Sequence, residues 1–430
     1  MKKVLIITYY WIPSGGSGVQ RWVKFTKYLR DFGWEPVVYT PSNPEFPSID
    51  SSFGKDIPTD VEVIKTPIWE PYNIYRTMMG RKGEAINAGF ISENKKSGWK
   101  DKLSIWVRGN FLIPDPRRFW VKPSVRFLSK YIQENPVDAI ISTGPPHSMH
   151  LVGMGLKKKF PRLKWVADFR DPWTGIYFFD DLKLNSFSKN IHFRLEKKVL
   201  AKSDKIIVVS QGMKNNLDGN FQLKTTILTN GYDSQDFVGN ENILDEKFSI
   251  SHIGLLTEKQ NPVLLWKILA EICNENEEFN KDLQIKLIGK TDFSVIKSIQ
   301  QNNIEDKLTR IDYIPHDEAV RMQHRSQLLL LLLVNKENTQ NILTGKFFEY
   351  LAAKRPILAI GAKDGDVATV LKKAKAGKIV DFAEEKELKA GLLEFYKQYQ
   401  SGTLNVNPDG IEQFSRSSLT RELADLLNTL

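Results

Sequence analysis

The stretch KVLIITYYWIPSGGSGVQRWVKFTKYLRDFGWEPVVYT, residues 3–40, decides the fold class. Its first part, Lys3 to Thr8, is an apolar, β-branched run that predicts a buried strand. The glycine-rich segment PSGGSG breaks this run, and the apolar side chains from Val19 to Phe32 then follow mostly helical spacing. Gly33 ends the predicted helix, because glycine readily adopts positive φ, and Pro36 to Thr40 is the next strand. The order strand, loop, helix, strand is typical of parallel sheets.

The same pattern recurs along the chain in two series. In the first series, further strands are predicted at Ala139–Ser142, Lys164–Ala167 and Lys205–Ser210. The second series begins after about residue 245, with strands at Phe248–Ile253, Leu283–Ile288, Thr309–Ile314, Leu328–Val334, Pro356–Ile360 and Ile379–Phe382, and helices at Pro262–Cys273 and Lys346–Ala353. Strands that alternate with helices require a parallel sheet covered on both faces. We therefore expect an α/β protein with two doubly wound, Rossmann-like domains and a cleft between them.

The domain boundaries follow from these two series. We expect a first domain at residues 1–240, which holds an insertion at about 66–125 that fits neither series. A second domain is expected at residues 241–410, followed by a terminal helical segment at 411–430.

Composition places the chain among ordinary globular proteins. Of its 430 residues, 41% are apolar and 26% are charged. The longest apolar run, Leu328 to Val334, is far shorter than the roughly 18 residues that cross a bilayer. The start of the chain resembles a signal peptide only briefly, and we interpret it as the first strand. The one cysteine, Cys273, excludes an internal disulfide and fits a cytoplasmic location.

Positive charge is concentrated in one part of the insertion. The net charge of the chain is +10, and the window from Arg76 to Arg126 holds twelve basic and four acidic residues. The basic residues are Arg76, Arg81, Lys82, Lys95, Lys96, Lys100, Lys102, Arg108, Arg117, Arg118, Lys122 and Arg126. Such a concentration indicates a polyanionic partner, which can be a phosphate-bearing substrate, an anionic membrane surface or nucleic acid.

The glycine-rich loop before the first helix is a candidate phosphate contact. Backbone N–H groups at Gly16 and the positive end of the helix converge there, and Arg21 lies one turn further on. The spacing is not that of the dinucleotide fingerprint G-x-G-x-x-G. The structural alternative is a tight turn that needs small residues.

A second candidate phosphate site lies in the segment from Leu343 to Ala359. A helix is predicted to begin at Thr344-Gly345, where free N–H groups can bind a diphosphate, and Lys346 adds a full positive charge. Glu349 lies about one turn further along. Its carboxylate can accept hydrogen bonds from the vicinal hydroxyls of a ribose whose phosphates lie at the helix start.

Residues Leu343–Ala359 resemble the donor-site helix of family 4-like glycosyltransferases with the GT-B fold, in which Lys-x-x-Glu-Tyr-x-Ala-Ala-x-x-Pro precedes a strand. Other segments resemble further motifs of this family in the family's order: Tyr9–Trp11 with Gly18–Arg21, Ser142–Ser148, Ala167–Trp173, Thr229–Asp233 with Phe237, His252–Gly254 with Asn261–Pro262, and Phe414–Arg416 with Leu419–Thr420. The last of these resembles a helix that crosses back onto the first domain. The resemblance extends to enzymes of bacterial surface-polysaccharide synthesis.

The sequence departs from the family pattern at two positions. Relatives often carry a second glutamate eight residues before the position of Glu349, and here that residue is Asn341. The sugar contact is therefore lost or replaced by Asn338 or Asn341. Many relatives place an arginine after the glycine equivalent to Gly254, where this chain has Leu255. Lys259 is the candidate for the second phosphate cation, and the alternative is a solvated loop lysine.

Two loops of the first domain hold the best polar cluster. Residues 142–150 and 167–173 both follow strands, so we expect both at the carboxyl edge of the sheet, where open α/β sheets bind ligands. His147 offers a proton shuttle near neutral pH. The acidic and basic residues of the second loop can orient acceptor hydroxyls, or they can form an Arg–carboxylate clamp that only fixes the loop.

Individual residues have the following expected roles. Catalytic roles are expected for Lys346, His147 and Asp171. Donor-binding roles are expected for Gly16, Gly254, Lys259, Thr344, Gly345, Lys346 and Glu349. Acceptor-binding roles are expected for Arg21, His150, Asp168 and Arg170. The pair Asp180-Asp181 lies among aromatic residues that favour a lip or flap, so we assign no metal.

The basic insertion also carries aromatic residues, among them Trp99, Trp106, Phe111, Phe119 and Trp120. This mixture suits peripheral contact with a membrane or a lipid-linked acceptor through residues 76–126. A solvated face over a small core is the plain alternative. Single-stranded nucleic acid is disfavoured, because aromatic residues in a globular insertion usually pack inward.

The expected function is transfer of a sugar from a nucleotide-diphosphate sugar to a hydroxyl of a lipid-linked or cell-surface glycan precursor. The resemblance implies retention of anomeric configuration and a leaving phosphate that helps to remove the acceptor proton. The helix starts and lysines would neutralise the leaving group, so no metal or other cofactor is expected. One rival is a sugar-nucleotide 2-epimerase of similar fold, which would need several acids around the sugar. The other is a non-catalytic nucleotide- or polyanion-binding protein.

Overall fold

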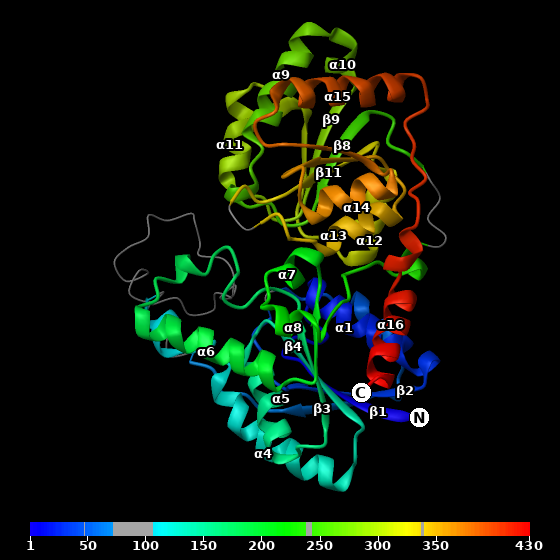
Figure 1. Ribbon diagram of the computed structural model, residues 1–430. Helices are drawn as coiled ribbons and strands as arrows, with labels where there is room; N and C mark the ends of the chain where they lie inside the picture. Colours follow the sequence, from blue (N-terminus) through cyan, green and yellow to red (C-terminus); the bar gives the residue numbers. More distant parts are fainter. Residues whose placement is uncertain (47, 72–105, 238–242, 337–338) are drawn as a thin grey trace. The chain divides into compact units, whose positions relative to one another are not determined.

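The computed structural model describes residues 1–46, 48–71, 106–237, 243–336 and 339–430, and its chain forms two compact units (Figure 1). Unit 1 consists of Met1–Thr229 and Ser417–Leu430, and unit 2 of Asn230–Arg416. The division falls before the expected residue 240, because Tyr232 already pairs with the end of unit 2. The backbone N–H of Tyr232 donates to the Phe414 carbonyl at 3.1 Å, and its carbonyl accepts from the Arg416 N–H at 2.8 Å.

Unit 1 contains a seven-stranded parallel sheet with the order β3-β2-β1-β4-β5-β6-β7. The strands are β1 Lys2–Ile7, β2 Trp34–Pro41, β3 Glu62–Thr66, β4 Ala139–Gly144, β5 Lys164–Phe169, β6 Lys205–Val208 and β7 Thr225–Ile227. The helices are α1 Ser17–Tyr28, α4 Arg118–Glu134, α5 Ser148–Lys159, α6 Ser186–Lys202, α7 Gln211–Asn215, α8 Gly219–Gln222 and α16 Arg416–Asn428. The strand order reverses direction between β1 and β4.

Both faces of this sheet are buried, because alternate side chains of each strand point to opposite sides. Leu5 and Ile7 of β1 belong to a core that includes residues of α4 and α5. Val4 and Ile6 belong to the opposite core, which includes residues of α1 and α16. The final helix therefore completes the core of unit 1 although it is the last part of the chain. The first helix ends as predicted: α1 continues as a 3-10 turn at Leu29–Phe32, and Gly33 follows with φ 81°.

Unit 2 contains a six-stranded parallel sheet with the order β10-β9-β8-β11-β12-β13. The strands are β8 Phe248–Ile253, β9 Leu283–Ile288, β10 Leu308–Ile311, β11 Leu328–Leu332, β12 Ile357–Ile360 and β13 Gly377–Val380. The helices are α9 Val263–Glu275, α10 Glu277–Asp282, α11 Phe293–Gln301, α12 His316–Arg325, α13 Gly345–Ala352, α14 Asp366–Ala374 and α15 Glu385–Gln400. The two units confirm the predicted architecture of two doubly wound α/β halves.

The leucine run of β11 shows why this sheet is covered on both faces. Leu328, Leu330 and Leu332 lie in the core with α9, α11 and α15, whereas Leu329 and Leu331 lie in the core with α13 and α14. Cys273 packs half-buried against the first of these cores, as a small apolar residue. Among the described residues, no helix has the length and apolar character needed to span a membrane.

Candidate functional site

The predicted donor residues of unit 2 gather at the carboxyl ends of the central strands. β8 ends at Ile253, and Gly254 follows with φ 120°, a conformation that L side chains rarely adopt. A Cβ atom at Gly254 would lie 2.8 Å from the Nζ of Lys346. Glycine is therefore required here for two reasons, its backbone angle and the close approach of the lysine.

The start of α13 presents three polar groups in succession. Thr344 is the N-cap residue in an extended conformation, and Gly345 and Lys346 open the helix. The Oγ1 atom of Thr344 is buried, and within the described part of the chain it has no hydrogen-bond partner. Burial lowers the pKa of Lys346 to about 8, because the charged ammonium loses part of its hydration. This arrangement is suited to an anion, which would accept hydrogen bonds from the Thr344 hydroxyl and the Lys346 ammonium.

The position of α13 is fixed by the core beneath it. Phe347, Phe348 and Leu351 are fully buried in the second core of unit 2. The Tyr350 hydroxyl accepts a hydrogen bond of 2.9 Å from the N–H of Ile253, so it ties the helix to the end of β8. Lys346 and the loop after β8 are thereby held together.

Lys346 has a protein partner that the sequence analysis did not identify. Its Nζ lies 3.2 Å from the Nε2 of His252, a residue of β8 that is 1% exposed. Burial and the nearby Lys346 charge lower the pKa of His252 to about 3, so the imidazole is neutral at pH 7. The spacing of 94 positions between the two residues leaves no local sequence signal for this pair.

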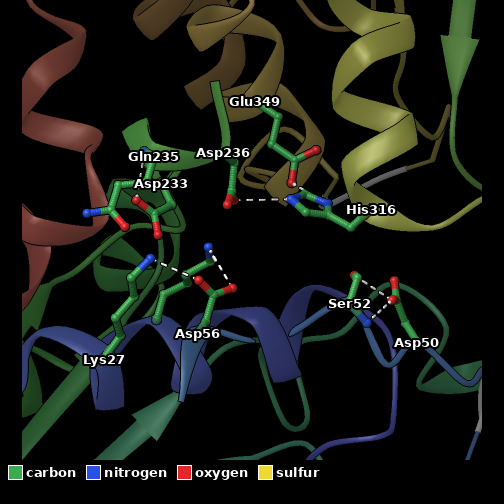
Figure 2. A network of polar contacts seen from close by, with 10 residues as sticks. Lys27, Asp50, Ser52, Asp56, Asp233, Gln235, Asp236, His316 and Glu349 are labelled. Atoms are coloured by element: carbon green, nitrogen blue, oxygen red, sulfur yellow. Dashed lines mark hydrogen bonds and ion pairs between the residues drawn. The ribbon is translucent and has the colours of Figure 1, made fainter. Parts of the chain in front are cut away.

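Glu349 lies one turn after Lys346, in a polar network with residues of neighbouring segments (Figure 2). Its Oε2 accepts a hydrogen bond of 3.0 Å from Gln323, and its Oε1 lies 3.8 Å from the Nδ1 of His316. The other ring nitrogen of His316 lies 3.3 Å from an oxygen of Asp236. His316 is the first residue of α12. The carboxylate of Glu349 is thus oriented by groups on both of its oxygens.

The other residues considered for the donor site lie outside α13. Lys259 is exposed in the turn after β8, and with Asn335 it lines a cavity of about 490 Å³ within unit 2. Leu255 contributes a carbonyl oxygen 3.4 Å from His252. Asn341 is half-buried, and Asn338 lies outside the described residues.

In unit 1 the two predicted loops lie side by side at one edge of the sheet. They follow β4 and β5, which are neighbouring parallel strands, and Thr143 pairs in register with Asp168. The prediction from strand order is therefore confirmed for the position of these loops.

Arg21 and Asp168 form a buried ion pair rather than an open polar site. Both side chains are 0% exposed, and Arg21 Nη2 lies 3.1 Å from Asp168 Oδ1. The guanidinium also donates to the carbonyls of Leu228 and Thr229, at 2.9 and 2.6 Å. Asp168 also accepts hydrogen bonds from the side chains of Trp22 and Thr143, at 3.0 and 2.8 Å. This geometry favours the clamp interpretation over the expected acceptor contacts, because protein groups already occupy these donors and acceptors.

His150 is enclosed by the first-domain core. Its Nδ1 lies 3.0 Å from the hydroxyl of Ser142, and its ring stacks on Phe169 at 4.4 Å between centroids. Burial lowers its pKa to about 3, so it carries no charge at pH 7. The sequence predicts that His150 contacts the acceptor. The structure disfavours this contact, because the imidazole is neutral and fully buried.

His147 stacks on Trp173 with ring centroids 4.7 Å apart. Burial lowers its pKa well below the ordinary value, with a further contribution from His150. A neutral imidazole can still accept or donate a hydrogen bond, but it does not exchange a proton readily near pH 7. The expectation of a shuttle at neutral pH is therefore corrected to a neutral hydrogen-bonding group.

Arg170 packs against the first turn of α1. Its guanidinium donates to the Pro145 carbonyl, and a Cβ atom at Gly18 would lie 1.5 Å from its Nη1. Gly16 is exposed at the N-cap of α1 with φ 104°. Asp171, the next residue after Arg170, is exposed to solvent. Of the acceptor-side candidates, Asp171 is therefore the most accessible.

The chain is similar to known proteins in sequence over part of its length and in fold over all of it. The model of Glycosyltransferase Family 4 matches residues 91–236, and a sequence search of curated proteins finds no match. Similar solved structures include sucrose-phosphate synthase from Thermosynechococcus elongatus, with a TM-score of 0.63 and 12% identity over 100% of this chain and 99% of that chain. HepE from Anabaena, in complex with UDP-glucose, has a TM-score of 0.59 and 13% identity over 100% of both chains.

A third similar structure is a Listeria monocytogenes protein described as a UDP-N-acetylglucosamine 2-epimerase. It has a TM-score of 0.54 and 11% identity over 100% of this chain and 96% of that chain. At such identities the structural likeness shows the common GT-B fold alone, whereas the family model matches the sequence itself. The family match is confined to residues 91–236, and the chain is a glycosyltransferase with the GT-B fold.

Proposed function

We propose that this chain transfers a sugar from a nucleotide-diphosphate sugar to a hydroxyl of a glycan or lipid-linked acceptor, with retention of configuration and without a metal or other cofactor. The observation that carries the proposal is the cluster at the start of α13. There the buried Thr344 hydroxyl and the Lys346 ammonium precede the oriented carboxylate of Glu349 by one helical turn. Along the helix, the hydroxyl and the ammonium come first and the carboxylate second, which matches a diphosphate followed by its ribose.

The chemistry requires stabilisation of a departing diphosphate while positive charge develops at the anomeric carbon. The N–H groups at the start of α13 and the Lys346 ammonium would meet that negative charge in a preorganised site. The protein itself thus supplies the positive groups for which other enzymes use a metal ion. The complex of the similar Anabaena protein with UDP-glucose supports a sugar nucleotide as the donor.

On the acceptor side we retain Asp171, His147 and Arg170 as candidates. All three follow β4 or β5 at the carboxyl edge of the unit 1 sheet, where ligands bind in open α/β folds. The leaving phosphate would assist removal of the acceptor proton, as the family resemblance implies.

A sugar-nucleotide 2-epimerase remains the second candidate, because a protein described as one shares the fold. Such an enzyme removes and returns a proton on the sugar, so it needs acid and base groups around the sugar ring. The position eight residues before Glu349 is Asn341, whose amide serves neither role. The family model favours transfer.

A binding screen followed by product analysis tests the proposal. We expect UDP, GDP, ADP or dTDP, and one sugar nucleotide of the same base, to raise the melting temperature, since ligands that bind the native state stabilise it. Incubation of that sugar nucleotide with lipid-linked glycan acceptors should give a glycosylated product. A new free sugar nucleotide without a glycosylated acceptor would identify an epimerase, and the absence of any nucleotide binding would refute both.

We further propose that unit 1 contacts an anionic membrane through a basic–aromatic surface. Its exposed aromatic residues include Trp106, Phe111 and Phe187, and its exposed basic residues include Arg118 and Lys183. The side chain of Asn110 joins these segments, because it donates to the Lys183 carbonyl at 3.3 Å and accepts from the Asn185 N–H at 2.8 Å. Residues 76–105 of the predicted contact, with Trp99, lie outside the described residues.

Vesicle co-sedimentation tests this surface. Phe187 and Phe111 are 74% and 61% exposed, so replacing both with serine should weaken binding to vesicles that contain phosphatidylglycerol without loss of folding. Leu223→Ser is the matched control, because Leu223 is 87% exposed after α8, outside this surface. Equal binding of the wild type and the Phe111→Ser/Phe187→Ser variant, or binding to pure phosphatidylcholine alone, would contradict an anionic membrane contact.

A further inference from the structure

His252 is a buried polar residue in the middle of an apolar sheet, and both of its ring nitrogens face polar atoms. Its Nδ1 lies 3.0 Å from the carbonyl oxygen of Leu330 on the neighbouring strand β11. Its Nε2 lies 3.2 Å from the Nζ of Lys346. Buried polar atoms in proteins are nearly always hydrogen-bonded, so the partners of the two nitrogens define the state of the ring.

These partners assign the tautomer of the ring. A carbonyl oxygen only accepts, so Nδ1 must carry the proton that it donates to Leu330. Because burial keeps the imidazole neutral, Nε2 then holds a lone pair. That lone pair faces Lys346, whose ammonium has three N–H donors and no acceptor. The Leu255 carbonyl, 3.4 Å from the same Nε2, receives no proton from it in this tautomer.

We propose that His252 is a positioning residue: it accepts a hydrogen bond from Lys346 and thereby holds the lysine ammonium at the start of α13, in place for the donor diphosphate. This positioning role rests on the proposed function. Neither the motif at the start of α13 nor the family match assigns a role to His252. Lysine has a long, flexible side chain, and fixing its ammonium before the donor binds lowers the entropy lost on binding.

The surroundings of Lys346 leave few other ways to hold it. Gly254, in the loop after β8, has no side chain that could hold the lysine, and a Cβ atom at this position would displace the Lys346 ammonium. Glu349 lies on the same helix and favours the charged form of Lys346, but its oxygens face Gln323 and His316. His252 is the group that β8 directs toward the lysine.

Two substitutions at His252 separate the role in the sheet from the role toward Lys346. In His252→Asn the amide nitrogen can take the place of Nδ1 and keep the bond to Leu330, but the side chain is too short to reach the lysine. In His252→Gln the longer side chain can place an oxygen near the former Nε2. Ser251→Ala is the control for disturbance of the strand, because Ser251 is fully buried in β8 and its hydroxyl has no partner among the described residues.

Affinities are measured by calorimetry for the tightest-binding of UDP, GDP, ADP and dTDP, for the matching nucleoside, and for inorganic pyrophosphate. We expect His252→Asn to weaken diphosphate and pyrophosphate binding about tenfold and to leave nucleoside binding unchanged, because only the phosphates meet Lys346. His252→Gln and Ser251→Ala should retain wild-type affinity for all three. In a Lys346→Ala background, His252→Asn should have no further effect, since its partner is gone.

The outcomes distinguish this inference from the function on which it rests. If the wild type binds the diphosphate but His252→Asn binds it equally well, or weakens nucleoside and diphosphate alike, the positioning role is refuted while the donor site stands. If His252→Asn still weakens diphosphate binding without Lys346, the histidine acts by another route and the inference is wrong. A wild-type protein that binds no nucleoside diphosphate would refute the donor site and this role together.

Discussion

Replacing Lys346 with alanine is expected to lower kcat for sugar transfer by on the order of 10²–10³-fold, the range found when one preorganised charge-stabilising group is removed from an active site. The reason is that negative charge grows on the leaving diphosphate as the bond to the sugar breaks. Lys346 is the cation that the structure places at the start of α13, beside the closely approaching Gly254. Steady-state kinetics with saturating donor measure the loss.

A matched control shows whether the loss is specific to this lysine. Lys372→Ala removes an exposed lysine from α14, in the same unit, and should retain wild-type kcat. Circular dichroism and the melting temperature of both variants report whether they fold. If the Lys346→Ala protein folds and keeps the wild-type kcat, α13 does not contribute to the chemical step.

The same lysine predicts the direction of the pH dependence. Burial disfavours its ammonium and lowers its pKa to about 8, and the neighbouring Glu349 offsets this only in part. The free protein therefore loses the proton as pH rises through about 8, and donor affinity should fall above that value. His252 does not contribute in this range, because its pKa of about 3 keeps it neutral. Calorimetry from pH 7 to 9.5 checks this, and an equal decline in Lys346→Ala would assign the effect to another group.

The sequence predicts the central strands well and the sheet edges poorly. The central strands are continuous buried apolar runs, such as β11, where every residue is buried. β3 and β7 were missed for physical reasons. β3 at Glu62–Thr66 has no fully buried residue, and β7 at Thr225–Ile227 has only three residues. Edge strands are paired on one side only, so their burial, and with it their sequence signal, is weak.

The same contrast applies to the candidate site. Residues that are neighbours in the sequence can be predicted to act together, whereas contacts between distant residues cannot. Thr344, Lys346 and Glu349 are neighbours on one helix start, so their spacing alone predicts that they act together. The partner of Lys346 comes from β8, and no periodicity connects the two segments. Arg21 and Asp168 show the opposite problem. Arg21 lies in the first turns of α1 and Asp168 at the end of β5, positions that suggest ligand contacts, yet the two residues are 147 positions apart and neutralise each other in the core.

Replacing Glu349 with alanine is expected to raise the KM for the donor about 10–100-fold with a smaller effect on kcat. A hydrogen bond to a charged group contributes about 1.5–3 kcal/mol, and the carboxylate is proposed to accept from the ribose hydroxyls, which do not change during the reaction. Gln323 and His316 already orient this carboxylate, so it is prepared for a ligand rather than mobile.

A ligand substitution makes this prediction specific to the ribose. The wild type should bind a ribonucleoside diphosphate more tightly than its 2′-deoxy analogue, because the analogue lacks one donor to the carboxylate. In Glu349→Ala the two ligands should bind alike, since the group that distinguishes them is gone. Gln323→Ala serves as the control: it removes a partner of Glu349 but keeps the carboxylate, so the preference for ribose should persist. If Glu349→Ala still prefers the ribonucleotide by the wild-type margin, another residue holds the ribose and α13 contacts only the phosphates.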